Sequence, residues 1–129
     1  MVRQYQEENV YEALQKRFHY LFEEFENIYI SFSGGKDSGV LLNLLLDFKR
    51  RHYPDRVIGL FHQDFEAQYS VTTEYVESTF QRLEQEVDPY WVCLPMATRT
   101  AVSSYEMYWY PWDDMKRDIW VRPMLDHPY

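Results

Sequence analysis

Residues 27–46 read NIYISFSGGKDSGVLLNLLL, and this stretch decides the fold. The run at 28–32 is β-branched and aromatic, which is typical of a buried strand. The loop SGGKDS follows at 33–38, and an apolar pattern over 40–46 then predicts a helix buried on nearly all sides. Three of the chain's four glycines lie in or directly after this loop, at Gly34, Gly35 and Gly39. This clustering predicts a tight strand-to-helix turn whose backbone a ligand approaches closely.

The pattern on either side of this stretch extends the same alternation. Apolar residues recur at helical spacing from Tyr11 to Phe25, within a helix that we expect over residues 5–26. A second strand is expected over 56–62, a third helix over 69–87 that Pro89 ends, and a third strand over 90–96. The order predicts an α/β fold: a Rossmann-like parallel sheet with flanking helices and right-handed crossovers.

The pattern weakens beyond Pro95. Residues 98–107 are compatible with one more helix, and the rest is expected to be mostly loop. Aromatic residues crowd this last quarter, at Tyr105, Tyr108, Trp109, Tyr110, Trp112 and Trp120. They pack a core, stack on a base, or form an interface with a protein partner, for which Tyr and Trp are common anchors.

The composition limits the class of protein. A chain of 129 residues suits one domain over 1–129. The net charge of −8 argues against a broad basic surface that would bind nucleic acid or anionic lipid. The chain shows neither a signal peptide nor a membrane-spanning stretch, so we expect a cytoplasmic protein. Cys93 is the sole cysteine, which excludes an internal disulfide, and its apolar surroundings predict a small buried side chain.

The loop at 33–38 has the composition of an anion site. Adjacent glycines let successive N–H groups point into one concavity, and the start of the next helix adds free N–H groups and a positive dipole. Ser33 and Ser38 supply hydroxyl groups and Lys36 a positive charge. Asp37 either caps the helix or braces the loop, or it helps to hold Mg²⁺ with a nucleotide. Neither the Walker A spacing nor the dinucleotide fingerprint G-x-G-x-x-G is present.

The motif FSGGKDS after a strand resembles the pyrophosphate-binding loop of the adenine nucleotide α-hydrolase superfamily. That superfamily includes ATP pyrophosphatases, the nucleotide-binding subunit of ATP sulfurylase and phosphoadenosine phosphosulfate (PAPS) reductases. The wider pattern, HQDFEAQYSVTTEYV and WYPWDDMKRDIWVRPM, is most similar to the PAPS reductase family. Within it, the nearest resemblance is to a bacterial and prophage-borne branch that includes co-activators of prophage gene expression.

The resemblance implies an adenine nucleotide, ATP or PAPS, as the ligand, with Mg²⁺ as a possible companion. The residues that it implies at the phosphates or phosphosulfate are Ser33, Gly34, Gly35, Lys36, Asp37 and Ser38. Asp64 matches the acidic position of the family's VDTG motif. Because the run here is QDFEAQ, the motif's glycine and threonine are absent. The role of Asp64 stays open between ribose, metal or substrate contact and a cap on the following turn.

Two departures from the family bear on activity. PAPS reductases use a cysteine in a C-terminal segment, and nothing after Cys93 can serve as one. The sequence also offers three clear strands where the family has more. The chain is either a shortened relative or the N-terminal part of a larger domain, and the exposed sheet edge favours the latter. No catalytic residue is assigned.

Two functions therefore follow from the sequence. One is nucleotide binding, with adenylation or sulfonucleotide chemistry in the complete protein. The other is a regulatory or interaction protein that keeps the nucleotide fold without catalysis.

Two further groups of residues are weaker candidates for a site. His62, Asp64 and Glu66 alternate and so share one face of a strand, as metal ligands do, but only the distant His127 or Asp113 would complete a metal site. Basic residues of the late loops either fold over the strand ends toward an anion or are ordinary solvated charges: Arg99, Lys116, Arg117 and Arg122.

Overall fold

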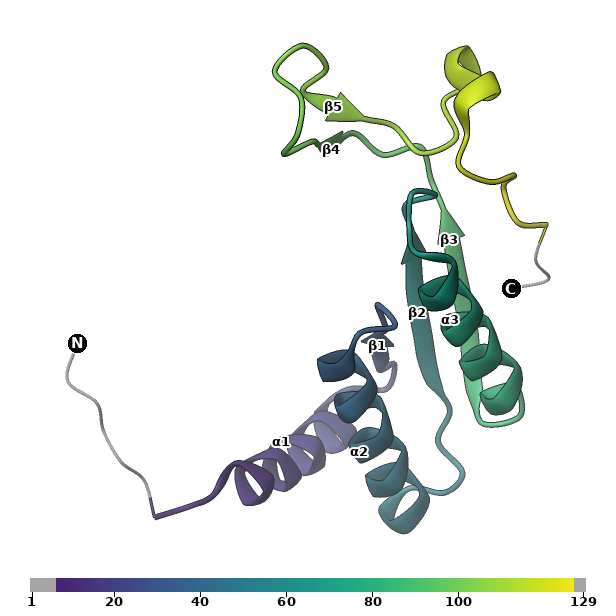
Figure 1. The fold of residues 1–129 in the computed structure, drawn as a ribbon. Coiled ribbons are helices and arrows are strands. Elements are labelled where there is room, and N and C mark those ends of the chain that lie inside the picture. The colour runs from purple at the N-terminus through teal and green to yellow at the C-terminus, as the bar shows by residue number, and fades with distance from the viewer. Residues whose placement is uncertain (1–6, 127–129) are drawn as a thin grey trace.

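The computed structural model describes residues 7–126 and confirms the expected alternation of helices and strands (Figure 1). The order is α1 (Val10–Glu24), β1 (Tyr29–Ser31), α2 (Lys36–His52), β2 (Ile58–Asp64), α3 (Ser70–Leu83) and β3 (Val87–Cys93). The strands form one parallel sheet in the order β1-β2-β3, with β2 in the centre. The chain is therefore an α/β protein with a parallel sheet flanked by helices.

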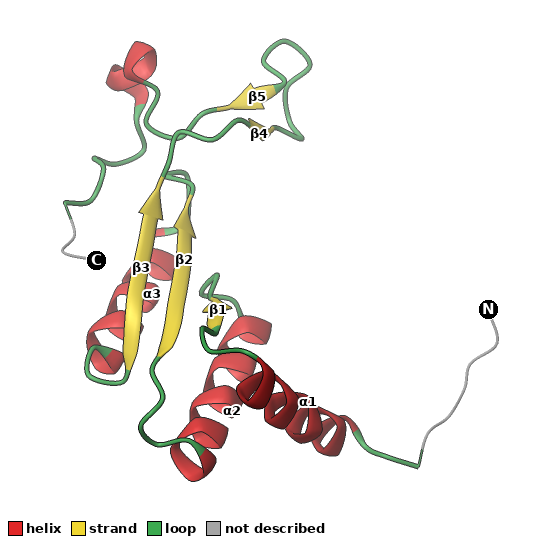
Figure 2. Cartoon of the chain, turned by 180° about the vertical axis from the view of Figure 1, so that it is seen from behind, coloured by secondary structure: helices red, strands yellow, loops and turns green. Residues whose placement is uncertain are grey.

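Both crossover helices cover the same face of the sheet. Each connection steps the chain one strand further in the same direction, so right-handed crossovers place α2 and α3 together, as Figures 1 and 2 show. The core lies between this helix layer and the sheet. Its largest fully buried apolar side chains are Phe32, Leu42, Leu46, Phe48, Ile58, Leu60, Val76, Phe80 and Leu83.

Helix α1 is shorter than the helix expected over 5–26. Asn9 caps its start: the Asn9 side chain accepts a bond from the Glu12 N–H at 2.9 Å, and the Glu12 carboxylate accepts one from the Asn9 N–H at 3.1 Å. This capping box fixes the N-terminus at Val10, and the extended backbone of Phe25 ends the helix. Residues 5–6 lie outside the described residues.

Helix α2 is not buried on nearly all sides, as its apolar sequence predicted. It buries one stripe that includes Leu42, Leu45 and Phe48, whereas Val40 is 56% exposed and Leu41 40% exposed. A helix on one face of a sheet has a single covered side, so a run of leucines overestimates its burial.

The end of the third helix also differs from the prediction. Helix α3 ends at Leu83, and Pro89 lies inside β3, opposite Leu60 of β2. Proline is tolerated there because β3 is an edge strand of the described sheet, where a missing N–H need not interrupt a pairing.

Residues 98–107 do not form the helix that the sequence allowed. They begin a small antiparallel hairpin of β4 (Thr98–Arg99) and β5 (Tyr108–Trp109). The Ser103 hydroxyl accepts bonds from the N–H groups of Tyr105 and Glu106 and so favours a turn. A 3-10 helix, η1 (Asp114–Ile119), follows in the predicted loop region. No helix of the described residues is long and apolar enough to cross a membrane.

Candidate functional site

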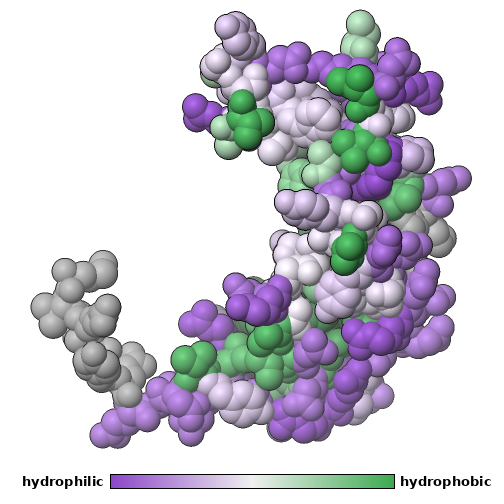
Figure 3. Space-filling view, viewed as in Figure 1, coloured by the Kyte–Doolittle hydropathy of each residue, from purple (hydrophilic) through white to green (hydrophobic). Residues whose placement is uncertain are grey.

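The loop 33–38 lies where β1 ends and α2 begins, at the carboxyl edge of the parallel sheet. Ligands of open α/β sheets bind at this edge. In Figure 3 the molecule has a crescent outline, bounded by α1 at one end and the β4–β5 hairpin at the other. The loop and the first turn of α2 lie along the concave side.

Two serine hydroxyls brace this loop from within. The Ser38 hydroxyl donates to the Gly35 carbonyl at 3.0 Å and accepts from the Ser33 N–H at 3.3 Å. The Ser33 hydroxyl lies 3.1 Å from the Ser38 hydroxyl and accepts from the Gly35 N–H at 3.3 Å. Gly35 is the N-cap of α2 and provides no side-chain cap. The N–H groups of the first turn therefore lack a side-chain acceptor and are open to an anion.

The two loop glycines are required for different reasons. Gly34 has φ +77°, and a Cβ there would lie 2.8 Å from the Val76 side chain, so the fold itself needs this glycine. Gly35 has an ordinary extended backbone, and a Cβ there would meet only the Ser33 hydroxyl at 3.3 Å. The missing side chain at Gly35 leaves space outside the protein, where a ligand can reach the backbone.

Lys36 and Asp37 are both exposed in the first turn of α2. Neither side chain has a hydrogen bond or ion pair with another residue of the described chain. Asp37 therefore neither caps α2 nor braces the loop, because Ser38 performs the bracing. Its negative charge is favourable beside the positive end of the helix dipole, and its carboxylate is available to a cation.

A cavity of about 640 Å³ opens beside the loop. It lies between Ser33, the β2–α3 connection and the late segment of the chain, and its lining residues are Ser33, Ala67, Gln68, Tyr69, Thr72 and Val121. Its volume lies within the range of small-molecule and cofactor sites. Gly34, Gly35 and Lys36 line a neighbouring groove of about 550 Å³ over α2. The loop, this groove and the cavity together form the candidate site.

Asp64, at the end of β2, does not open into this cavity. It is fully buried and accepts bonds from the Glu66 N–H at 2.9 Å and the Trp91 indole at 2.9 Å, and it pairs with the Arg122 guanidinium. Both of its oxygens are thus engaged inside the protein. The implied contact between Asp64 and a ligand remains a prediction, and the geometry favours the alternative in which Asp64 holds the following turn.

Glu66 is equally buried and holds the late segment against β2. Its carboxylate accepts bonds from the Trp112 N–H at 2.5 Å and the Val121 N–H at 2.7 Å. Residues 110–122, which we name the closing segment, therefore lie over the end of β2. Arg122 lies above the Trp112 ring at 5.3 Å and pairs with Asp64. Of the late basic residues that the sequence singled out, Arg122 therefore folds over the strand ends.

The other late charges stay at the surface or pair locally. Lys116 pairs with Glu106 at 2.7 Å, and Arg117 lies over the Trp120 ring at 5.2 Å. Among the described residues, no group of three or more His, Cys, Asp and Glu side chains is placed to hold a metal ion. His127, named above as a distant ligand, lies outside the described residues.

His62 and Cys93 lie near Asp64, but the environment of each side chain opposes its charged, reactive form. His62 is buried, and its Nδ1 lies 2.7 Å from the Phe32 carbonyl. Burial lowers the pKa of His62, so the neutral ring is favoured. Cys93 is half-buried, and burial raises the pKa of its thiol, which opposes formation of a nucleophilic thiolate.

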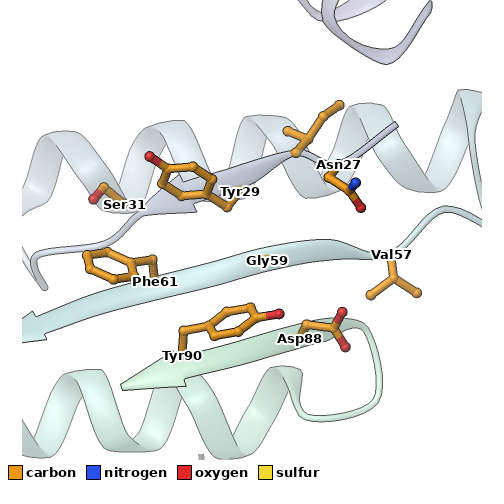
Figure 4. A pocket seen from close by; sticks show the side chains of 9 residues that line it. Asn27, Tyr29, Ser31, Val57, Gly59, Phe61, Asp88 and Tyr90 are labelled. Atoms are coloured by element: carbon orange, nitrogen blue, oxygen red, sulfur yellow. The ribbon is translucent and has the colours of Figure 1, made fainter. Parts of the chain in front are cut away.

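Helices α2 and α3 leave one face of the sheet uncovered (Figure 2). A second hollow lies on this face (Figure 4). It has a volume of about 420 Å³, and the rings of Tyr29, Phe61 and Tyr90 border it around Gly59. A Cβ at Gly59 would lie 2.9 Å from the Tyr29 side chain, so the glycine forms the floor. The hollow is a feature of an uncovered parallel sheet and contains no residue of loop 33–38.

The structure has the predicted residues Ser33 to Ser38 on one strand-to-helix turn, and their role as a ligand site stays a prediction. The sequence did not indicate three residues that shape the space beside this turn. Val121 lines the cavity from far along the chain, Glu66 holds it there, and Trp112 is the second anchor point. Glu66 was visible only as one of three alternating polar residues after a strand. Nothing in local spacing indicated that its partners lie 46 and 55 positions later.

Comparison with known proteins gives one relative to report. The chain is 34% identical over 116 residues to the uncharacterized protein YbdN of Escherichia coli K12, a match that covers 88% of this chain. The chain spans 27% of the length of that relative. No protein-family model matches the chain, and no solved structure matches it.

Proposed function

We propose that this chain binds an adenine nucleotide, ATP or PAPS, through loop 33–38, as a PAPS reductase-like member of the adenine nucleotide α-hydrolase superfamily. The observation that carries the proposal is the loop at the carboxyl end of β1, with its uncapped helix start and its open space at Gly35. This arrangement suits a phosphate group that bonds to backbone N–H groups.

The side chains of the loop suit the same ligand. Lys36 brings an exposed positive charge that no carboxylate of the described chain neutralises. Asp37 is available to Mg²⁺, which commonly accompanies nucleotide phosphates with only one or two protein carboxylates. Ser33 and Ser38 hold the backbone in a fixed shape before the ligand arrives, which reduces the entropy cost of binding.

In the complete protein the same loop would serve one of two reactions. In adenylation an acceptor attacks the α-phosphorus of ATP, the bond to the β-phosphate breaks, and pyrophosphate leaves. The N–H groups and Lys36 would then stabilise the charge that builds on the leaving group. In sulfonucleotide reduction the loop would hold the phosphosulfate while a thiol supplied from elsewhere attacks sulfur. The bond between sulfur and the bridging oxygen breaks, the nucleotide leaves with that oxygen, and the thiol carries the sulfur as an S-sulfonate. No nucleophile of this chain is assigned to either reaction.

Calorimetry tests the proposal. We expect ATP or PAPS to bind in the presence of Mg²⁺, and Lys36→Ala to weaken binding about tenfold, as loss of a charge-assisted contact does. Lys16→Ala is the matched control, because it removes an exposed lysine from α1. The proposal fails if neither nucleotide binds at millimolar concentration, or if Lys36→Ala binds as tightly as Lys16→Ala.

A second candidate function, a regulatory or interaction protein, is favoured by the uncovered sheet face. Parallel sheets are normally covered on both faces, and here Tyr29 is 70% exposed and Tyr90 52% exposed on the open one. Tyr90→Lys puts a charge on this face. If the protein acts by binding a partner there, this variant should lose biological activity and keep its affinity for ATP. Loss of activity in Lys36→Ala but not in Tyr90→Lys would exclude it.

A further inference from the structure

We propose that Glu66 is a positioning residue that holds the closing segment, residues 110–122, over the cavity beside loop 33–38, so that Val121 contacts the nucleoside part of the bound nucleotide. This inference rests on the proposed function, because it assigns the phosphates to the loop and the rest of the ligand to the cavity. It concerns residues outside the glycine loop.

The first observation is the pair of bonds that Glu66 accepts. A buried carboxylate is costly unless it is fully hydrogen-bonded, and Glu66 obtains its bonds from the closing segment, at Trp112 N–H and Val121 N–H. The two donors flank η1, so one carboxylate fixes both ends of the closing segment. Removal of the segment would leave this carboxylate without these two donors.

The second observation is backbone strain at the same contact. Two non-glycine residues of the described chain have positive φ, Glu66 at 63° and Trp112 at 47°, and they are the two ends of one hydrogen bond. Such conformations cost free energy and persist where the surroundings impose them, often at functional sites. The strain therefore lies at the attachment of the closing segment.

The third observation places the segment at the cavity. Val121 donates its N–H to Glu66, while its side chain is 60% exposed and lines the cavity together with Ser33 of the loop. Its exposed side chain therefore forms part of the cavity wall. Ser33 is the loop residue that borders this cavity, so a nucleotide with its phosphates on loop 33–38 and its nucleoside on the Ser33 side of the loop would contact Val121.

Further contacts keep the closing segment rigid rather than free to swing. The Trp112 indole donates to the Arg122 carbonyl at 3.2 Å, and the Trp120 indole donates to the Asp113 carbonyl at 2.9 Å. The segment is therefore a preformed wall attached at Glu66 and also at Asp64, through Arg122. Loss of the Glu66 attachment should displace Val121, while the pair of Arg122 with Asp64 keeps the segment near the end of β2.

The test compares ATP with inorganic pyrophosphate, both with Mg²⁺, on full-length variants. Glu66→Gln replaces one acceptor oxygen by an NH₂ group that cannot accept the backbone N–H facing it. We expect the ATP affinity of this variant to fall about tenfold and its pyrophosphate affinity to change less than about twofold. Amide hydrogen exchange at Trp112 and Val121 should accelerate, while exchange in β2 stays slow.

Val121→Ala supports the test if Glu66→Gln fails to fold, because Val121 is exposed and its truncation leaves the anchor intact. This variant should have a lower affinity for ATP and an unchanged affinity for pyrophosphate. Glu106→Gln is the matched control, since it removes an exposed carboxylate that pairs with Lys116 of the same segment. This control should alter neither affinity.

The outcomes separate the two proposals. If the wild type binds pyrophosphate and ATP, but both variants bind ATP as the wild type does, the inference about Glu66 is overturned and the proposed function stands. If the affinities for ATP and pyrophosphate fall equally in both variants, the closing segment affects the phosphate-binding loop itself. The assignment of Val121 to the nucleoside is then wrong. If the wild type binds none of ATP, PAPS and pyrophosphate, both proposals fall.

Discussion

Loop 33–38 and the end of β2 lie at the same edge of the sheet, yet their polar groups are used in opposite ways. In the loop, Lys36 and Asp37 are exposed and have no partner in the described chain. At the end of β2, Asp64 and Glu66 are fully buried and saturated by internal donors. Polar groups that are hydrogen-bonded within the protein stabilise the fold. Exposed polar groups at the concave edge, such as Lys36 and Asp37, are available to a ligand.

The strongest test of this comparison replaces one aspartate in each region. Asp64→Ala should lower the free energy of unfolding by about 3–5 kcal/mol, because it leaves Arg122 without its counter-ion in a partly buried site and removes the carboxylate that accepts the Trp91 indole N–H. Asp37→Ala should cost less than about 1 kcal/mol, the size of a first-turn charge effect. Urea unfolding of both variants measures the difference, and equal losses would contradict the comparison.

The next largest effect distinguishes the two loop glycines. Gly34→Ala should destabilise the protein by about 1–3 kcal/mol, because Ala would have to adopt a positive φ and would clash with Val76. Gly35→Ala keeps an allowed backbone and should cost at most about 1 kcal/mol at an N-cap. Its ATP affinity should nevertheless fall more than tenfold, because the new methyl group occupies the space where the phosphate approaches.

Thermal unfolding and calorimetry on the same two samples give the result. A Gly35→Ala variant that binds ATP normally would show that the open space over the loop is not used. A Gly34→Ala variant as stable as the wild type would remove the reason for separating the two glycines.

The sequence predicted the loop well because its requirements are local. A strand, two glycines, two hydroxyls and a helix start lie within a dozen residues, and each has a short-range physical signature. The end of β2 was predicted poorly because its partners are remote: Glu66 is satisfied by N–H groups at Trp112 and Val121, which only the folded chain brings near. Backbone N–H groups carry no residue signature, so such bonds leave no motif.

Burial misled the prediction in the same way. The apolar run of α2 indicated how much of the helix could be buried, but the number of covered sides depends on which layers the chain supplies. Val40 stays exposed for this reason. Pro89 likewise ends a helix in most contexts, and only the sheet order shows that an edge strand can accept it.

A smaller effect tests His62, which connects the two regions through its bond to the Phe32 carbonyl. Burial holds the pKa of His62 below the ordinary value of 6.5. Between the lowered pKa and 6.5 the unfolded chain binds more protons than the folded chain, so the free energy of unfolding rises with pH in this window. Stability should therefore decline as pH falls below 6.5.

Urea unfolding across pH 5 to 7.5 measures this slope. The His62→Gln variant should show a shallower slope in the same range than the wild type, because the titrating ring is gone. An unchanged slope would mean that His62 is protonated to the same extent in the folded and unfolded chains. Burial would then not lower the pKa of His62.

The smallest expected effect concerns Gly39, which the sequence grouped with the loop glycines. It lies inside α2, and a Cβ there would meet the Tyr75 hydroxyl at 3.7 Å, an ordinary contact. Gly39→Ala should therefore raise the free energy of unfolding by about 0.5–1 kcal/mol, as helix propensity favours Ala over Gly. ATP affinity should be unchanged, which calorimetry on the stabilised variant would show. If binding is lost while stability rises, the ligand extends from the loop along the groove over α2, which Gly34, Gly35 and Lys36 line together with Gly39, Asn43 and Tyr75. The boundary between groups used by the fold and groups left for the ligand would then lie one helical turn further along the chain than loop 33–38.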